Sequence, residues 1–315
     1  MGLTSKEIVS VIIVAGGKNG YLESCLVSVK DQTYPSIETI VIDNSLDNNF
    51  SQGVIKRYSG LKLYPQEQDI SYCQALNLGL KQSTGEFALC LNDDVVLEKE
   101  FIEKALNGFF IDPKVGMVSG KILRADKQTI DSAGLFLSLY RTAKERGYGV
   151  KDRGQFEKEE YIFGVNGAVA FYRKEMLEAV KEKGGYFDPC FRFFYEDLDI
   201  AWRAQRIGWR GYYVPYAVAY HKRGATARKN RGIGKPFARR YLSDELHFDL
   251  IKNRYLCMVK NESCPGFLSH FPCIFLYDFI MWSYILLFRP QLIKYFRRLV
   301  SILVDKTKDR EGAKK

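Results

Sequence analysis

Apolar and polar residues alternate along the first hundred residues in two distinct patterns. Short β-branched or continuous apolar runs are typical of buried strands, whereas apolar residues at every third or fourth position predict helices. We expect strands at 9–14, 37–42, 61–64 and 86–91, and helices at 21–32 and 72–82. Strands that alternate with helices in this way predict a parallel sheet with crossover helices.

The next hundred residues repeat these signals less regularly. We expect strands at 163–172 and 212–220, and helices at 173–183 and 196–206. Gly184-Gly185 and Gly208 follow the two helices, where glycine commonly ends a helix. The pattern therefore predicts one large α/β unit up to about residue 221.

Glycine and polar side chains follow three of the predicted strands where each one ends. Gly16-Gly17 follows the first strand, Asp43 the second, and Asn92, Asp93 and Asp94 the fourth. Ligands of open α/β sheets bind beyond the carboxyl ends of the strands, so we expect one shared crevice. The glycine pair and Asp43 also suit ordinary turns. The adjacent carboxylates favour a hard cation with oxygen ligands, because like charges repel unless a cation offsets them.

A second acidic cluster opens the predicted helix at 196–206. Glu196, Asp197 and Asp199 follow the aromatic-rich stretch 191–195 directly. Acidic residues stabilise the first turn of any helix, which is one interpretation. The other is a general base, because neighbouring aromatic side chains exclude water and tune a carboxyl pKa.

Composition and charge separate the body from the last third of the chain. The chain is 46% hydrophobic and 27% charged, which excludes a disordered or collagen-like protein. Residues 1–221 hold 27 basic and 29 acidic side chains, but residues 222–315 hold 20 and 8. The basic segment predicts an anionic partner. Seven scattered cysteines and no export signal predict a reduced, cytoplasmic protein.

The basic C-terminal third contains a loop-like segment and two apolar stretches. Arg228, Lys229, Arg231 and Lys235 lie among glycines, as in a solvated basic loop. Residues 271–288 are apolar apart from Asp278, Ser283 and the tyrosine hydroxyls, and seven of the 18 are aromatic. Residues 292–303 predict a basic amphipathic helix.

We expect 271–288 to lie in a membrane interface, because 18 residues with a carboxylate at Asp278 are poorly suited to spanning a bilayer. The alternatives are packing on the α/β unit or a homodimer interface. Nucleic acid is not expected, since the sequence carries no recognisable nucleic-acid module.

Together these motifs resemble the family 2 glycosyltransferases, especially their bacterial rhamnosyltransferase-like branch. The resemblance runs from about Val9 to His221 and rests on VSVIIVAGG, QTYPSIETIVIDN, ALNLGL, LCLNDDVVL, GVNGAVAFYRKEM and FFYEDLDIAWRAQRIGWRGYYVPYAVAYHKRG. The family often has an aromatic-Asn pair where this chain has Gly16-Gly17, and its metal motif often begins with aspartate where this chain has Asn92.

The resemblance implies roles for individual residues. Asp197 is expected to be the catalytic base, with Glu196 beside it, and Asp94, His221 and Asn92 are expected to hold Mn²⁺ or Mg²⁺. The expected donor-binding residues are Gly16, Asp43, Asn77, Asn92, Asp93, Gly167 and Arg173. From the residues alone, His221 also suits an ordinary core or surface histidine.

The expected fold is α/β: a GT-A type nucleotide-sugar-binding domain, with a Rossmann-like mixed sheet flanked by helices and a helical C-terminal extension. We place the catalytic domain at 1–225, with a donor-binding half at about 1–120 and an acceptor half at about 121–225. A basic loop and helix at 226–265 and membrane-associating helices at 266–315 follow.

The expected reaction is metal-dependent transfer of one sugar, with inversion, from dTDP-rhamnose or a UDP-sugar to a glycan acceptor. We expect a polyprenyl-diphosphate-linked acceptor, an anionic membrane surface as partner, and a location on the inner face of the plasma membrane. Repeated polymerisation is not expected, because the chain lacks a QxxRW motif. A nucleotidyltransferase and a non-catalytic nucleotide-sugar-binding module are the alternatives.

Overall fold

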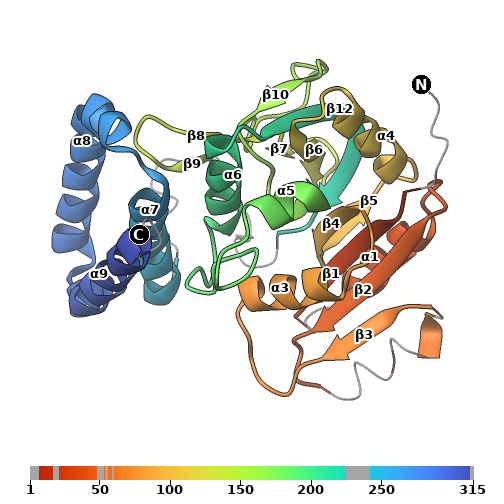
Figure 1. Cartoon of the computed structure of the whole chain (residues 1–315), viewed down its shortest axis with the longest axis horizontal. Helices are drawn as coiled ribbons and strands as arrows, with labels where there is room; N and C mark the ends of the chain where they lie inside the picture. The colour runs from red at the N-terminus through yellow and green to blue at the C-terminus, as the bar shows by residue number, and fades with distance from the viewer. Residues whose placement is uncertain are drawn as a thin grey trace.

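A mixed β-sheet forms the centre of the molecule, and three C-terminal helices form one end of it (Figure 1). The computed structural model describes residues 7–16, 21–47, 53, 56–58, 60–223 and 242–312. Gly17 and residues 224–241, with Arg228, Lys229, Arg231 and Lys235, lie outside the described residues.

The described strands form a ten-stranded sheet and a separate hairpin. The large sheet has the order β10-β12-β6-β11-β4-β1-β2-β3, with β5 beside β12 and β7 beside β6. Its strands are β1 (Val9–Ala15), β2 (Ile37–Asp43), β3 (Lys62–Pro65), β4 (Phe87–Asn92), β5 (Val95–Leu97), β6 (Val115–Arg124), β7 (Ile130–Ser132), β10 (Glu160–Ile162), β11 (Val169–Arg173) and β12 (Arg210–His221). The hairpin pairs β8 (Leu135–Leu137) with β9 (Ala143–Glu145).

The helices cover both faces of the sheet and build the C-terminal end. They are α1 (Tyr21–Lys30), α3 (Tyr72–Gln82), α4 (Phe101–Asn107), η1 (Gly108–Phe110), α5 (Lys174–Ala179), α6 (Glu196–Arg206), α7 (Asp244–Asn261), α8 (Cys264–Phe288), η3 (Pro290–Tyr295) and α9 (Phe296–Gly312). Alternate side chains of β1 point to opposite faces. Ile12 packs in the cluster that contains α3, whereas Val11 and Ile13 pack in the cluster that contains α1.

The fold confirms the predicted parallel core. Strands β1, β2, β3 and β4 run parallel, with Asn92 level with Val14, so the predicted ligand edge is formed by the ends of neighbouring strands. The predicted strand at 163–172 is wrong in its first half, because β11 begins only at Val169. Asn166 instead makes a turn, in which its Oδ1 accepts a hydrogen bond from the Ala168 amide at 2.9 Å. The helix predicted at 173–183 ends at Ala179.

Buried polar side chains join α7 to the catalytic body. In α7, Lys252, Asn253, Arg254 and Asn261 are all buried, although their composition alone favours a solvated helix. Lys260 Nζ lies 2.8 Å from Glu182, 2.9 Å from Asp188 and 3.0 Å from Asp199. This single ammonium group therefore connects α7 to α6 and to the loop before it.

Removing this ammonium group should destabilise the protein. In Lys260→Met, Asp188 keeps Lys306 at 2.9 Å and Asp199 keeps Arg203 at 2.9 Å, so neither carboxylate loses every cation. We expect a loss of about 2–3 kcal/mol, below the ~3–5 kcal/mol typical of a buried charge left entirely alone. Urea unfolding followed by circular dichroism measures this loss. Lys181→Met, which removes an exposed ion pair to Glu178, is the control and should cost less than about 1 kcal/mol. Equal losses in the two variants would contradict the expectation.

Candidate active site

Asp94 and His221 lie together at the end of the sheet, an arrangement consistent with the pairing that the family resemblance implies. Asp94 lies in the turn between β4 and β5, directly before Val95, and His221 ends β12, and the pairing of β5 with β12 brings the two segments together. Asp94 Oδ1 lies 3.3 Å from His221 Nε2, and both side chains are more than nine-tenths buried. One carboxylate oxygen and one imidazole nitrogen thus face each other at the edge of the crevice.

Asp131 orients His221 from behind, and the sequence analysis did not find it. Its Oδ2 lies 2.8 Å from His221 Nδ1, and it is fully buried. Arg223 binds its other oxygen, and Arg124 Nε lies 3.5 Å away. When Nδ1 donates its proton to Asp131, Nε2 remains free to bind a cation, which is the usual role of a carboxylate behind a ligating histidine. Asp131 lies on the short strand β7, 90 positions from His221 in the chain, so no local motif marks it.

Asn92 and Asp93 connect this edge to neighbouring elements. The Tyr72 hydroxyl lies 2.8 Å from Asn92 Oδ1 and 3.2 Å from the Gly167 carbonyl oxygen. Asp93 Oδ2 accepts a hydrogen bond from the Gly16 amide at 2.9 Å. Burial raises the pKa of Asp93 to about 6, although the Gly16 amide favours the charged form. Three predicted site residues, Gly16, Asn92 and Asp93, therefore meet at the ends of β1 and β4.

Glu196 and Asp197 form the second half of the site, at the start of α6. Asp197 Oδ2 accepts a hydrogen bond from the Gly167 amide at 3.1 Å, and Oδ1 accepts one from Leu198 at 2.7 Å. A Cβ at position 167 would lie 3.0 Å from Glu196 Oε1 and 3.4 Å from Asp197 Oδ2. The missing side chain of Gly167 therefore leaves room for both carboxyl groups.

Burial and mutual repulsion perturb these carboxyl groups. Burial raises the pKa of Asp197, and burial together with the neighbouring Asp197 raises the pKa of Glu196. Glu196 Oε2 is buried and accepts no hydrogen bond from the part of the chain that is described. Two neighbouring buried carboxyl groups hold one negative charge more easily than two, so one of them is ionised while the other keeps its proton.

Glu145 is a third carboxyl group near this pair, and the sequence analysis also missed it. It lies on β9, where Ser132 donates to it and Asn166 Nδ2 donates to its Oε1 at 2.8 Å. Burial, with repulsion from Asp197, raises the pKa of Glu145 to about 8. Since Ser132 is the neighbour of Asp131, the short strand β7 contacts both halves of the site.

The backbone that leads into α6 has an uncommon conformation. Phe194 and Tyr195 have φ values of 72° and 71°, in the left-handed region, and neither is glycine. This conformation costs about 1–2 kcal/mol for each such residue. Tyr195 is also the N-cap of α6, and its side chain makes no capping hydrogen bond.

Asp43 lies at the predicted edge, whereas two other acidic or polar residues, Asn77 and Asp199, have structural partners. Asp43 is buried at the end of β2, level with Ala15, and accepts a hydrogen bond from the Ser45 amide at 2.9 Å. Asn77 uses its amide group on the Phe187 backbone, at 2.7 and 2.9 Å. Asp199 is buried against Arg203, Lys260 and Asn261, so it is not the solvated helix-start residue that one interpretation predicted.

The expectation that Arg173 binds the donor is wrong. Strand β11 runs antiparallel to β4, which places Arg173 level with Phe87, at the end of the sheet away from Asn92. Its guanidinium group donates to the carbonyl oxygens of Phe109 and Val115, at 2.7 and 3.0 Å. The placement of Asn77 likewise argues against donor contact, because both polar atoms of its amide already bind backbone.

The residues present fit a divalent cation that takes most of its ligands from a substrate. Across the described ranges, no three His, Cys, Asp or Glu side chains converge on one point. Asp94 and His221 supply two donors, and Mg²⁺ commonly uses one or two protein carboxylates together with substrate phosphates and water. Asn92 Oδ1 already accepts from Tyr72, so its second lone pair is the one left for a ligand.

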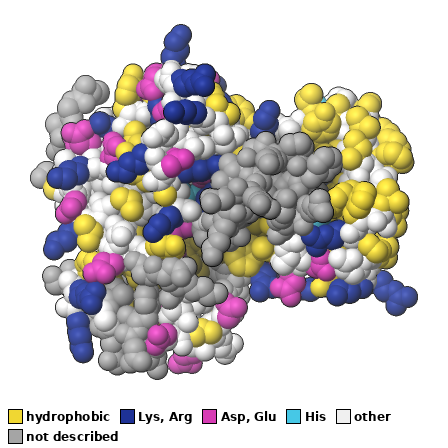
Figure 2. Space-filling model, turned by 180° about the vertical axis from the view of Figure 1, so that it is seen from behind, with side chains coloured by type: hydrophobic (Ala, Val, Ile, Leu, Met, Phe, Trp, Pro, Cys, Tyr) yellow, Lys and Arg dark blue, Asp and Glu magenta, His cyan; other side chains and the backbone are white. Residues whose placement is uncertain are grey.

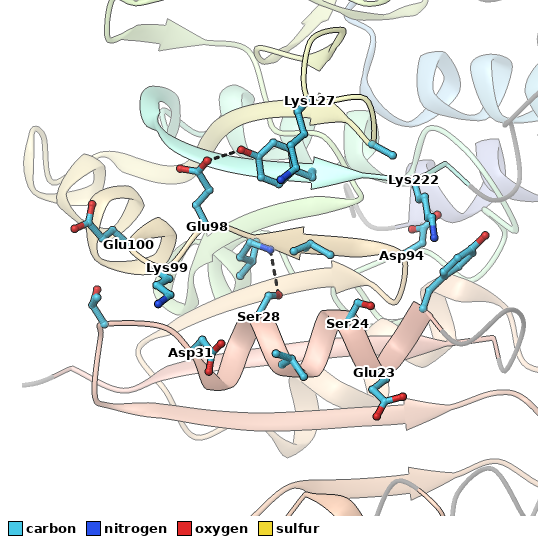
Figure 3. Close-up of a pocket in the computed structure, with 17 residues that line it drawn as sticks. Glu23, Ser24, Ser28, Asp31, Asp94, Glu98, Lys99, Glu100, Lys127 and Lys222 are labelled. Carbon is cyan, nitrogen blue, oxygen red and sulfur yellow. Dashed lines mark hydrogen bonds between the residues drawn. The ribbon is translucent and has the colours of Figure 1, made fainter.

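A groove of about 1,220 Å³ extends from Asp94 along α1 (Figure 3). Asp94 and Lys222 lie at one end of it, and Asp31, Lys99 and Glu100 at the other. Lys222 Nζ stands 4.0 Å from the centre of the Tyr21 ring, and Lys127 stands over Tyr220. The groove contains charges of both signs, and it shares Asp94 with the site.

Solved structures with similar folds place this domain in the GT-A class. GalNAc-T7 with UDP, GalNAc and Mn²⁺ superposes with a TM-score of 0.59 at 16% identity, over 81% of this chain and 48% of that one. The mannosyltransferase PcManGT from Pyrobaculum calidifontis, in complex with GDP-Man and Mn²⁺, superposes with a TM-score of 0.56 at 17% identity, over 96% and 76%. TarS of S. aureus gives 0.55 at 18% identity, over 81% and 40%.

The model of "Glycosyl transferase family 2" matches residues 10–181, and the chain belongs to this family. The poly-beta-1,6-N-acetyl-D-glucosamine synthases are similar over 223 residues, which are 68% of this chain and 50% of each relative. The identity is 23% for the Staphylococcus epidermidis protein and 22% for the Staphylococcus aureus (strain MSSA476) protein. The chain thus spans about half the length of the curated relatives it matches.

Proposed function

We propose that this protein transfers one sugar, with inversion, from a nucleoside diphosphate sugar to a glycan acceptor, and that it needs a divalent cation. The observation that carries the proposal is the hydrogen-bonded path between the two halves of the site. The Tyr72 hydroxyl contacts both Asn92 and the Gly167 carbonyl, and the Gly167 amide binds Asp197. The end of β4 that leads into Asp94 and the carboxylate of α6 are therefore held in one crevice.

Asp197 acts as the general base in this proposal. An acceptor hydroxyl must lose its proton as it attacks the anomeric carbon, and a carboxylate within hydrogen-bond reach accepts it. Raising the pKa of a carboxyl group brings it closer to the working pH, which improves proton transfer. Glu196, protonated beside it, orients the acceptor by donating a hydrogen bond. Because the proposal assigns one base and no nucleophile among the described residues, it favours one displacement and hence inversion.

Asp94 and His221 hold the cation, and Asp131 holds His221. When bound, Mn²⁺ or Mg²⁺ neutralises the charge that develops on the leaving diphosphate. The two structural neighbours that contain Mn²⁺ also contain UDP or GDP-Man, which supports a nucleoside diphosphate sugar as the donor. In this proposal Gly16, Asp43 and Asp93, at the ends of β1, β2 and β4, bind the nucleotide. dTDP-rhamnose and UDP-sugars are the donors to test first.

Nucleotide release tests this function directly. Purified protein is incubated with UDP-, dTDP- and GDP-sugars, with and without Mn²⁺, and the released nucleoside diphosphate is measured. We expect release from one donor, dependent on the cation. Release of diphosphate from a nucleoside triphosphate instead would identify a nucleotidyltransferase. Silence across the panel, with nucleotide binding retained, would favour the binding module.

The C-terminal helices suggest that the protein binds its acceptor at a membrane surface. Helix α8 is long and apolar enough to cross a membrane, and it is the one such helix in the described ranges. Its residues Phe267, Phe271, Phe275 and Phe279 form an exposed ladder with ring centres 5.7–6.4 Å apart. Figure 2 shows apolar side chains gathered over this end of the molecule. An exposed apolar surface of this kind is typical of a membrane contact.

We propose that α8 lies on the membrane and does not span it. At 25 residues it is about 37 Å long, enough for the bilayer core. Its other face, however, packs on polar α7, where Asp278 binds Arg254 and Trp282 donates to the Tyr255 hydroxyl. Spanning would draw the charged side chains of α7 into hydrocarbon. Lys294, Arg297 and Arg298 are exposed and can bind anionic headgroups beside the apolar face. This placement puts the protein at the inner membrane face, where a polyprenyl-diphosphate-linked acceptor would be bound.

Polar substitution of this face should abolish membrane binding without unfolding the protein. Phe275 and Phe279 are 59% and 62% exposed, so Phe275→Ser with Phe279→Ser removes little packing. We expect the parent to float with vesicles that contain anionic lipid, and the double variant to stay at the bottom of the gradient. Ile111→Ser with Ile207→Ser changes two equally exposed apolar residues of the catalytic body and is the control. A parent that does not float would refute the membrane contact.

A further inference from the structure

One face of α7 lies against the backbone that leads into α6. Asn253, Cys257, Lys260 and Asn261 recur at helical spacing and all face this region. Lys260 and Asn261 bind Asp199 in the first turn of α6. In Figure 1, α7 stands between α6 and the outer helix α8. The C-terminal helices thus contact the very segment that presents Glu196 and Asp197.

Asn253 makes the most direct of these contacts. Its Nδ2 donates to the carbonyl oxygens of Phe193 and Phe194, at 2.7 and 2.8 Å, and the residue is fully buried. One turn further along α7, Cys257 Sγ lies 3.6 Å from the Tyr195 carbonyl oxygen. Residues of α7 therefore contact three consecutive carbonyl groups before the catalytic pair, and the Asn253 amide donates to the first two of them.

These three residues include the two in the left-handed conformation. Phe194 and Tyr195 adopt φ values that favour glycine, and the α6 N-cap has no side-chain cap of its own. Such a backbone persists only where surrounding contacts impose it. Buried carbonyl groups need donors, and the Asn253 amide supplies both of its hydrogens here. The amide therefore sets the direction in which the chain enters α6.

We propose that Asn253 is a positioning residue for Glu196 and Asp197, and that α7 is part of the active site as well as a support for α8. Asn253 acts through the turn at 193–195, which fixes where the two carboxyl groups point into the crevice. The role assigned to Asp197 rests on the proposed function, whereas the control of the turn by Asn253 does not.

The test removes the two donated hydrogens in two ways, one that keeps the size of the side chain and one that shortens it. Asn253→Asp turns carboxylate oxygens toward the carbonyl groups, and Asn253→Ala removes the donors without adding charge. The control Ile251→Ala weakens the packing of α7 on α8 and α9 without contact to the turn, since Ile251 packs with Met281, Ile285 and Leu299. Hydrogen exchange over residues 193–199 reports the turn, because the Asp199 amide binds the Tyr195 carbonyl at 2.8 Å.

We expect faster exchange over 193–199 in both Asn253 variants and not in Ile251→Ala. With the donor found by nucleotide release, kcat should fall about 10- to 100-fold while KM for the donor stays unchanged, because misplacing a catalytic group impairs the chemical step. Unchanged exchange in this segment would overturn the proposal, as would an equal loss of kcat in Ile251→Ala at equal melting temperature. If Asp197→Asn keeps the parent kcat, Asp197 is not the general base. The rate of hydrogen exchange over residues 193–199 then decides by itself whether Asn253 holds the turn.

Discussion

Replacing Asp197 with asparagine should lower kcat by about 10²- to 10⁴-fold, the usual contribution of a general base. Asparagine has the same size as aspartate and keeps one oxygen. This oxygen can accept the hydrogen bond that the Gly167 amide donates to Asp197 Oδ2, at 3.1 Å in the parent. The variant loses the ability to take a proton and, because asparagine has one side-chain oxygen, the second hydrogen bond, which Asp197 Oδ1 accepts from the Leu198 amide. Single-turnover release of the nucleoside diphosphate measures the effect, and KM for the donor should change little. Asp112→Asn, which alters a surface carboxylate paired with Arg210, is the control.

The pH dependence of kcat provides a second test of the same residue. Only the ionised form of Asp197 accepts a proton, and burial raises its pKa. The rate should therefore rise with pH through a value above the ~4 of an ordinary aspartate. An Asp197→Asn variant that retains the parent rate and the parent pH profile would exclude Asp197 as the base.

Removing the cation, or its carboxylate ligand, should abolish turnover. EDTA is expected to stop nucleotide release, and Mn²⁺ in excess to restore it, because cation binding supplies several kcal/mol of charge stabilisation. Asp94→Ala should remain inactive at any practical Mn²⁺ concentration. The Asp94 carboxylate and the His221 imidazole, 3.3 Å apart, are the two proposed cation ligands. The variant would keep only His221 of this pair. Turnover that is unaffected by EDTA would refute the cation requirement.

Asp131→Asn separates ligand binding from ligand orientation. It leaves both donors in place and weakens the partner of His221 Nδ1, 2.8 Å away, together with the ion pair that Asp131 makes with Arg223. We expect the Mn²⁺ concentration for half-maximal activity to rise about 10- to 100-fold, the usual cost of losing such a partner. Full activity at saturating Mn²⁺ would confirm that Asp131 acts through His221, whereas inactivity at saturation would give it a different role.

The local pattern predicted the parallel half of the sheet closely. Helices α3 and α6 occupy the expected ranges 72–82 and 196–206, and β2 exceeds its expected range by one residue. These elements carry their own signals, because an apolar period of 3.6 or a β-branched run depends only on neighbouring residues. The strand expected at 163–172 failed where Asn166 bonds to its own backbone, a preference that competes with strand formation.

The site residues also divide into those that local motifs predicted and those that only the packing of distant elements revealed. Asp94, Asp197 and Gly16 follow from motifs at strand or helix ends. Arg173 was misplaced because the motif that contains it continues through a strand, and antiparallel pairing carries it to the far edge of the sheet. Glu145 and Asp131 were missed because each meets its partner only after β7 and β9 pack against the crevice.

The sequence by itself determined the class of fold, the carboxylate pair at 196–197, the acidic strand end at 92–94 and the basic, apolar C-terminal third. Each of these depends on the order of neighbouring residues, which periodicity and turn chemistry make visible. Tertiary structure alone decided that α7 is buried against the catalytic helix, that Asp131 stands behind His221, and that Arg173 and Asn77 bind backbone. Such contacts join residues about 60 to more than 100 positions apart, and their partners are chosen by how the elements pack.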